Sequence, residues 1–298
     1  MFKKPNLIGL GSGLFWGVST VVLGLALATL NIDSNSATLT TTFIHDLMSA
    51  SMLVLLIILI NKTKDLIKTI KSRSGLIIMG AALLGGPIGM GAYFIAINYL
   101  SPSIAASISA LYPAFGVVLA YFLLSEKITK NQVIGLAISI GAIMLMSFSN
   151  QLTVNNLFLG LLSISLCVIG WGSEAVIISY AMKQEVDSTI ALTIRQITSA
   201  FVYGVFIMPF IKYDFLMVII KDSRVLLYIT RASILATLSY LLYYKAIDLL
   251  GASRAMALNI SYPVWAFIFQ LLLFRVFSIS EMLLVTLIVI GIYVGLKQ

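Results

Sequence analysis

Long apolar segments follow one another along the 298-residue chain, and short polar stretches separate them. The segments are residues 7–30, 39–61, 75–99, 103–124, 132–149, 157–181, 189–211, 224–247, 252–275 and 280–296. Most of them reach the ~20 apolar residues with which a helix crosses the ~30 Å hydrocarbon core of a bilayer. The fifth and the tenth lie near the lower limit of that length. The pattern therefore predicts an all-α membrane protein with ten transmembrane helices.

Part of this pattern occurs twice, 150 residues apart. Residues 93–113 align with residues 243–263 without a gap, and the Tyr and Pro at the two ends of the stretch are identical in both copies. An internal repeat with five spans in each copy places the second copy upside down in the membrane. We therefore predict two inverted five-helix repeats, residues 1–150 and 151–298, that alternate access to a site at their interface.

Composition and charge agree with a membrane location. Hydrophobic residues make up 60% of the chain, charged residues make up 10%, and the mean hydropathy is +1.06, which excludes a water-soluble domain of this length. Thirteen Lys and Arg residues fall on one side of the predicted membrane and four on the other. Because cytoplasmic loops carry the excess, both termini are predicted to be cytoplasmic. The net charge of +8 then reflects topology and contact with anionic membrane lipid, not a nucleic-acid partner.

The common catalytic and nucleotide-binding motifs are absent from the sequence. It has no Gly-rich phosphate loop that ends in Gly-Lys-Ser/Thr, no His-Glu-x-x-His motif and no pair of cysteines. The loops between the predicted spans are too short for a soluble domain. We therefore expect no enzymatic activity, no metal site and no cofactor, and no ATP-driven transport by this chain alone.

Polar and aromatic residues at depth within the spans indicate a binding site. A charged residue at the centre of a membrane helix costs about 2.5–3.5 kcal/mol, so it usually faces a cavity or a partner. Glu174 lies well inside the sixth span, and Trp171, three residues earlier, is on the same helix face. Trp16 lies in a similar Trp-Gly pair in the first span, where a position at the lipid boundary is the alternative. An acid beside indole rings suits a cation.

The repeated Tyr-Pro pairs add further candidates. Pro113 and Pro263 are predicted to kink their spans, because proline removes one backbone hydrogen bond within a helix. Tyr112 in the first repeat, and Asn259 with Tyr262 in the second, would then face the site beside each kink. A kink that serves only helix packing is the alternative.

Tyrosines of the third and eighth spans complete a candidate aromatic cage. Tyr240 and Tyr243 are spaced i, i+3 on the eighth span, and Tyr93 is the repeat counterpart of Tyr243. Each ring around a quaternary ammonium group contributes about 0.5–2 kcal/mol. These rings together with Glu174 predict a site for a small organic cation, although such a stripe also occurs in plain helix packing.

Other ionisable residues within the spans leave alternatives open. His45 stands beside Asp46 in the second span and is a candidate proton carrier, because histidine titrates near neutral pH; Glu174 is the second candidate. A purely structural His–Asp contact is the alternative. Likewise, Arg195 is a candidate to neutralise Glu174, and Arg231 is a candidate to pair with Asp46.

A Gly-Gly-Pro run marks a candidate hinge. Gly85, Gly86 and Pro87 lie together in the third span and predict a bend that changes as access alternates, in addition to Pro113 and Pro263.

Several short motifs carry a family resemblance. They are residues 13–17 (Gly-Leu-Phe-Trp-Gly), 110–113 (Ala-Leu-Tyr-Pro) followed by 125–127 (Ser-Glu-Lys), and 261–263 (Ser-Tyr-Pro) followed by 280–281 (Ser-Glu). With them the chain resembles the drug/metabolite transporter superfamily, in its EamA-type branch of ten-span carriers, over nearly its whole length. More narrowly, it is similar to the choline permeases of the bacterial phosphorylcholine pathway.

That narrower similarity implies a function. It implies proton-coupled uptake of choline across the bacterial cytoplasmic membrane. It also implies a cage with Trp16, Tyr112, Trp171 and Tyr240 as walls and Glu174 as the nearby anion.

Three other functions share these features. An exporter of amino acids or amphipathic metabolites would use Arg195 for a carboxylate, and a multidrug cation exporter would use Glu174 with a looser cage. A membrane scaffold or lipid-handling protein would tie Glu174 and His45 into ion pairs. The sequence leaves open the substrate, the direction of transport, the coupling ion and the choice between monomer and homodimer.

Overall fold

The computed structural model describes residues 4–30, 35–100, 105, 108–109, 111–148, 156–211, 213–274 and 279–296, and this part of the chain contains helices and no strand. The helices are α1 (Lys4–Leu30), α2 (Asn35–Leu59), α3 (Thr63–Ile70), α4 (Arg73–Leu83), η1 (Leu84–Met90), α5 (Gly91–Leu100), α7 (Tyr112–Leu124), α8 (Lys130–Phe148), α9 (Leu157–Met182), α10 (Ser188–Val202), η2 (Tyr203–Ile207), α11 (Met208–Ile211), α12 (Asp214–Lys221), α13 (Ser223–Leu250), α14 (Ala252–Asn259), α15 (Tyr262–Phe274) and α16 (Ile279–Leu296).

Within the described residues, seven helices are long and apolar enough to cross a membrane. Three further apolar helices are shorter, at Tyr112–Leu124, Lys130–Leu145 and Met282–Leu296. The expectation of an all-helical fold with several helices long and apolar enough to span a membrane is confirmed for the described residues, whereas the ten spans and the two inverted repeats stay a prediction. The predicted fourth span lies partly outside the described residues.

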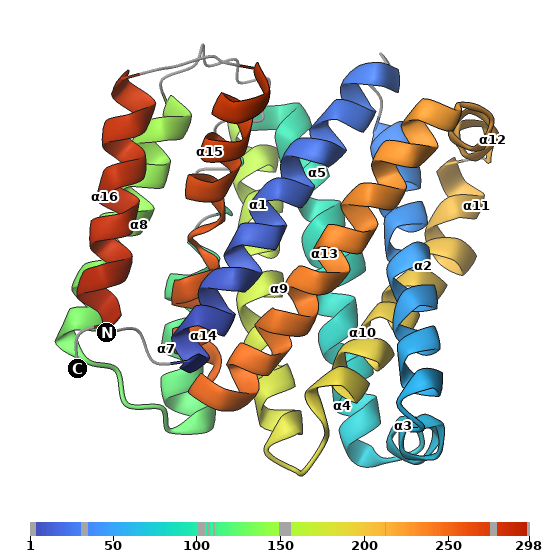
Figure 1. Cartoon of the computed structure of the whole chain (residues 1–298), viewed down its shortest axis with the longest axis horizontal. Helices are drawn as coiled ribbons and strands as arrows, with labels where there is room; N and C mark the ends of the chain where they lie inside the picture. The colour runs from blue at the N-terminus through green and yellow to red at the C-terminus, as the bar shows by residue number, and fades with distance from the viewer. Residues whose placement is uncertain are drawn as a thin grey trace.

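Neighbouring long helices pack in a regular set of pairs (Figure 1). α1 packs against α13 and α15, and α9 packs against α5 and α7. α2 lies against α10, and α8 lies against α16 at one side of the bundle. Glycines permit close approach of α1 to the ninth span, because a Cβ added to Gly13 or Gly17 would overlap Ser261 or Tyr262.

Hydrogen bonds between serines and backbone carbonyl groups fix α1 on α13. Ser239 donates to the carbonyl oxygen of Ser12 at 2.8 Å, and Ser19 donates to that of Ala232 at 2.9 Å. Residue numbers rise on one helix as they fall on the other, so the two helices are antiparallel.

Prolines interrupt three of the predicted spans. Pro87 lies inside η1, a π-helical turn between α4 and α5. Pro113 lies in the first turn of α7, and Pro263 lies in the first turn of α15, four residues after Asn259, the last residue of α14. The kinks predicted at Pro113 and Pro263 are therefore complete helix breaks, whereas the chain stays helical through Pro87. A proline at the start of a helix is stable there, because its missing N–H would have no partner within the helix.

Acidic side chains organise helix starts at the lower end of the bundle in Figure 1. Asp187 caps α10 by accepting hydrogen bonds of 2.9 and 3.2 Å from two N–H groups of its first turn. Glu126, just after α7, accepts hydrogen bonds of 2.9 and 3.1 Å from the first two N–H groups of α14. Gly251 joins α13 to α14 with a φ of 84°, a conformation that favours glycine.

Candidate functional site

A buried ion pair lies among the predicted site residues. Arg195 Nε on α10 donates to Glu174 Oε1 on α9 at 2.6 Å, and Arg195 Nη2 lies 3.4 Å from Glu174 Oε2. The two side chains are 7% and 13% exposed. The alternative in which Arg195 neutralises Glu174 is therefore the arrangement that the structure shows. Removing one partner of such a buried pair typically costs about 3–5 kcal/mol.

The same guanidinium faces a second carboxylate, on α2. Arg195 Nη1 lies 4.0 Å from Asp46 Oδ2, and the Ser199 hydroxyl donates to that oxygen at 2.7 Å. His45 Nδ1 lies 3.0 Å from Asp46 Oδ1, and both residues are buried. The predicted pairing of Asp46 with Arg231 is wrong, because Arg231 is on the exposed face of α13 while Asp46 points to α10.

Aromatic rings surround the guanidinium. Arg195 Cζ lies 5.3 Å from the centroid of the Tyr240 ring, over its face. The rings of Trp16 and Tyr240 are 5.3 Å apart between centroids. The Tyr244 hydroxyl donates to Glu174 Oε1 at 3.4 Å. A cation is thus held between a carboxylate and an aromatic face, which is the arrangement of a cation–π site.

Trp171 forms a second aromatic group one turn away on α9. Its ring lies 5.4 Å from that of Tyr93 and 5.9 Å from that of Tyr112, the latter edge to face. Its Nε1 donates to the carbonyl oxygen of Gly85 in η1 at 3.0 Å. The sixth span therefore brings an indole from one predicted repeat against two phenol rings of the other.

A polar chain crosses the bundle beside these rings. The Tyr112 hydroxyl donates to Asn259 Oδ1 at 3.2 Å, and Asn259 Nδ2 donates to the Ser12 hydroxyl at 3.0 Å. The chain connects α7, α14 and α1. The break that ends α14 at Asn259 leaves this amide at the point where the three helices meet.

The predicted substrate-site residues are all half-buried. Tyr243 packs against Tyr244 with ring centroids 6.4 Å apart, and the backbone of Tyr262 lies against Gly17 of α1. Half-buried residues keep part of their surface accessible, unlike core residues. This class contains Trp16, Tyr93, Tyr112, Trp171, Glu174, Tyr240, Tyr243, Asn259 and Tyr262.

Glycines of η1 make room for two of these side chains. A Cβ added to Gly85 would overlap the Glu174 carboxylate, and a Cβ added to Gly89 would lie 2.8 Å from Trp171 Cδ1. The glycines near Pro87 therefore serve close packing. The hinge motion at Gly85, Gly86 and Pro87 stays a prediction.

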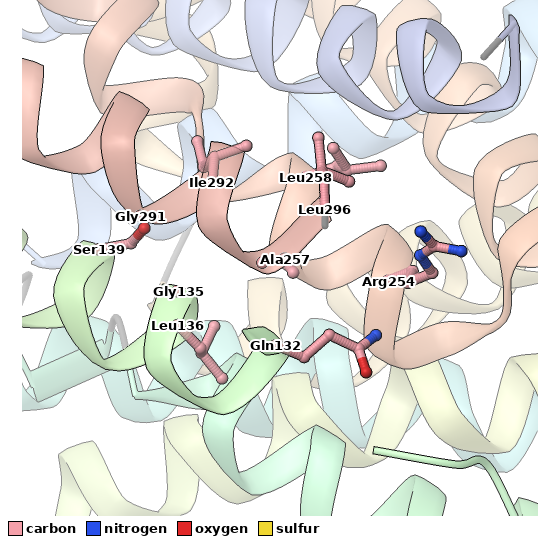
Figure 2. Close-up of a pocket in the computed structure, with 11 residues that line it drawn as sticks. Gln132, Gly135, Leu136, Ser139, Arg254, Ala257, Leu258, Gly291, Ile292 and Leu296 are labelled. Atoms are coloured by element: carbon pink, nitrogen blue, oxygen red, sulfur yellow. The ribbon is translucent and has the colours of Figure 1, made fainter. Parts of the chain in front are cut away.

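A separate small pocket lies between α8, α14 and α16 (Figure 2). Gln132, Ser139 and Arg254 are the polar side chains of its lining, which otherwise consists of apolar residues and glycines. The predicted site residues do not line it. Across the described ranges, no group of three or more His, Cys, Asp and Glu side chains is arranged to hold a metal ion.

Sequence reasoning missed two residues of the charged cluster. Gln196 Oε1 accepts a hydrogen bond from Arg195 Nη1, and Ser199 binds Asp46. The available signal was spacing, because Ser199 follows Arg195 by four residues and so shares its face of α10. Spacing alone did not indicate that α2 supplies the partner.

Apolar helices long enough to cross a membrane, with charged and aromatic side chains gathered between them, define a multi-pass membrane protein. The sequence pattern of the EamA-like transporter family matches residues 3–148 and again residues 158–296, so the chain belongs to this family. The protein is therefore a membrane transporter and not an enzyme.

Two individual proteins are similar to this chain. Protein LicB of Haemophilus influenzae is 36% identical over 197 residues, which make up 65% of this chain and 66% of LicB, just under two thirds of that relative. One solved crystal structure aligns with this chain with a TM-score of 0.73 and 16% sequence identity. The alignment covers 99% of this chain and 98% of the chain in that crystal structure. The second similarity supports the fold alone.

Proposed function

We propose that the protein is a secondary active transporter that imports a small organic cation, choline, across the bacterial cytoplasmic membrane by alternating access. Membership of the EamA-like family and the similarity to LicB support the transport part of this proposal. The observation that carries the choice of a cationic substrate is that the site already holds a cationic side chain of the protein.

That cation is the Arg195 guanidinium, over the Tyr240 ring and beside Glu174. A trimethylammonium group needs the same two partners, an aromatic face and an anion. In this proposal the substrate cation takes the position of the guanidinium at Glu174. The ion pair is then the substrate-free state of the site, in which an internal cation keeps a buried carboxylate paired.

The aromatic residues support a cage around such a cation. Trp16 and Tyr240 lie on one side of the ion pair, and Trp171 with Tyr112 lies one turn away. Each of these four side chains keeps part of its surface accessible. Tyr93, Tyr243, Asn259 and Tyr262 form the next set of proposed contacts.

We propose ten transmembrane helices in two inverted repeats, residues 1–150 and 151–298. The two matches of the family pattern, one in each half, support this division. The packing supports the symmetry, because α1 contacts α13 and α15 as α9 contacts α5 and α7. α9 also runs antiparallel to the third span, with Gly160 against Leu100 and Gly170 against Gly89, as α1 does to α13.

The lower end of the bundle in Figure 1 is the proposed cytoplasmic end, where both termini would lie. The helices α2, α9 and α13 end on this side (Figure 1), and Lys62, Lys183 and Lys245 lie within a few residues of those ends in sequence, which fits the excess of cations in cytoplasmic loops. Anionic membrane lipid is the expected contact of this charge, and the transporter is proposed to act as a monomer or a homodimer.

Proton coupling is proposed through His45 and Glu174. The His45 imidazole contacts Asp46, and Arg195 lies between Asp46 and Glu174, the carboxylate that is proposed to bind the substrate. A change of charge at His45 would therefore alter the electrostatic energy of a charge at Glu174, and the reverse, because interactions between charges are strong in a buried cluster. Choline uptake is expected to rise with an inward proton gradient, and uptake that ignores an imposed gradient would contradict the coupling.

Uptake of radiolabelled choline into proteoliposomes tests the substrate and the site. We expect the parent to accumulate choline and Glu174→Gln and Trp171→Ala to lose at least about tenfold in uptake, as the loss of a central ion or ring contact predicts. Gly24→Ala is the control, because an added Cβ there meets nothing within 4 Å. Undiminished uptake by both site variants would refute the site, and a parent without uptake would refute choline.

An exporter of amino acids or amphipathic metabolites is the second candidate, and Arg195 favours it, since a guanidinium binds carboxylates well. Against it, Arg195 already faces two acids of the protein. A multidrug cation exporter would use the same site. The direction of choline movement in cells that express the protein separates import from export.

A further inference from the structure

The charged cluster of the site contains one acid more than Arg195 balances. Glu174 and Asp46 are its two carboxylates among the described residues, and Arg195 is its permanent cation. The two carboxylates therefore exceed this permanent cation by one negative charge. A buried charge requires a partner. One monovalent cation meets that requirement, whereas a zwitterion has no net charge to contribute.

We propose that Asp46 determines substrate selectivity by making this site reject organic cations that also carry a carboxylate. The proposal rests on the proposed function, in which a cation binds at Glu174. Its basis is the position of Arg195 between the two acids, with Nε 2.6 Å from Glu174 Oε1 and Nη1 4.0 Å from Asp46 Oδ2.

A substrate cation at Glu174 displaces the guanidinium, which then needs another anion. Asp46 is within reach, because 4.0 Å exceeds a charge-assisted hydrogen bond by only about 1 Å. Asp46 is held in place by Ser199 at 2.7 Å and by His45 at 3.0 Å. Arg195 therefore keeps a carboxylate partner before and after substrate binds.

Because Arg195 stays paired with Asp46, no free guanidinium is left to bind the carboxylate of a zwitterion. A substrate carboxylate gains affinity in a buried site when a guanidinium is free to bind it. Here Asp46 occupies that guanidinium, and a second carboxylate beside it meets like charge. The site accordingly accepts a cation whose remaining polar group is neutral.

Choline and betaine form a matched pair of probes. Both carry a trimethylammonium group, and betaine has a carboxylate where choline has a hydroxymethyl group. Each compound competes against radiolabelled choline uptake in proteoliposomes that contain the parent or Asp46→Asn. Asparagine preserves the size of the side chain and its ability to bind Ser199, and removes only the charge.

We expect the parent to be inhibited by choline and not by betaine. In Asp46→Asn the half-inhibitory concentration of betaine relative to choline should fall by about tenfold or more, the effect of one charge-assisted hydrogen bond. Asp248→Asn, which removes an exposed acid paired with Lys245, should leave the ratio unchanged. An unchanged ratio in Asp46→Asn, with choline uptake retained, overturns the proposal and leaves the proposed function standing.

A second variant covers loss of transport or folding in Asp46→Asn. The double variant Asp46→Asn with Arg195→Gln restores the single excess negative charge, on Glu174 alone, and removes the guanidinium. Ligand-dependent thermal stabilisation in detergent reports binding without transport. Choline should stabilise the double variant and betaine should not, whereas stabilisation by betaine overturns the proposal. Parent protein that neither transports nor binds choline refutes the proposed function instead.

Discussion

The indole Nε1 of Trp171 donates a hydrogen bond to the carbonyl oxygen of Gly85 at 3.0 Å. One turn further along α9, Glu174 lies so close to Gly85 that an added Cβ would overlap its carboxylate. A single backbone position of the third span therefore fixes both an aromatic wall and the acid of the site. This relationship explains why the third span carries glycine here.

Gly85→Ala is expected to displace Glu174 from Arg195 and to lower choline uptake by at least about tenfold. Overpacking a tight contact typically costs about 1–3 kcal/mol, and thermal stability in detergent should fall with it. Gly80→Ala, at an exposed position of α4 with nothing within 4 Å of an added Cβ, is the matched control and should change neither. Normal uptake by Gly85→Ala would show that the position of Glu174 does not matter for transport.

Two substitutions of Tyr112 separate its ring from its hydroxyl group. Tyr112→Phe keeps the ring beside Trp171 and removes the hydrogen bond to Asn259, so stability should fall by about 1 kcal/mol while the KM for choline changes less than about threefold. Tyr112→Ala removes the ring, and the KM should rise by about tenfold. Equal KM values for the two variants would contradict a cage role for the ring.

Gly251→Ala is expected to destabilise the joint between α13 and α14. The residue has φ 84° and ψ 164°, a region that is nearly restricted to glycine and costs other residues about 1–3 kcal/mol. The added Cβ would also lie 2.6 Å from Glu126 Oε1. Melting temperature in detergent is the measurement, with Gly141→Ala as the control because its added Cβ meets nothing within 4 Å. An unchanged melting temperature in Gly251→Ala would contradict the strain.

Asp187, at the start of α10 and outside the span, predicts a pH dependence. Partial burial alone would raise the pKa of Asp187, but hydrogen bonds from Lys62 and from the N–H groups of Ile190 and Thr189 outweigh it, and the pKa is lowered below its ordinary 3.8. A lowered pKa in the folded state contributes stability that is present above the ordinary value and is lost as the pH falls through the folded one.

The measurement compares the stability of the parent with that of Lys62→Met as the pH is lowered. This variant removes the ion pair and keeps the Asp187 cap. The pair is partly exposed, with Lys62 Nζ 2.7 Å from Asp187 Oδ2, so its contribution is small, at most about 1 kcal/mol. The parent should be more stable near neutral pH, and the difference should shrink below about pH 4. A difference that grows on acidification would contradict this assignment.

Much of the helical fold followed from hydropathy, and the positions of the helix breaks followed from proline. Apart from the fourth, which lies partly outside the described residues, the apolar segments lie close to the described helices, and Pro113 and Pro263 mark real interruptions. Local sequence did not indicate the π-helical turn η1 or the connecting helices α3 and α12. The turn contains Pro87, and the side chains that pack against it, Trp171 and Glu174, lie far away in sequence.

Within the site, the sequence by itself determined which ionisable side chains lie at depth in the spans, because burying an acid in a bilayer is costly whatever the fold, and which aromatic side chains share a helix face with them. It therefore singled out Glu174, Trp171 and His45. Only the tertiary structure decided the partners, placing Arg195 on Glu174 and Asp46 and leaving Arg231 exposed. The physical reason is that a helical pattern fixes which residues share one face, whereas the rotation of α2, α9 and α10 against each other decides which faces meet.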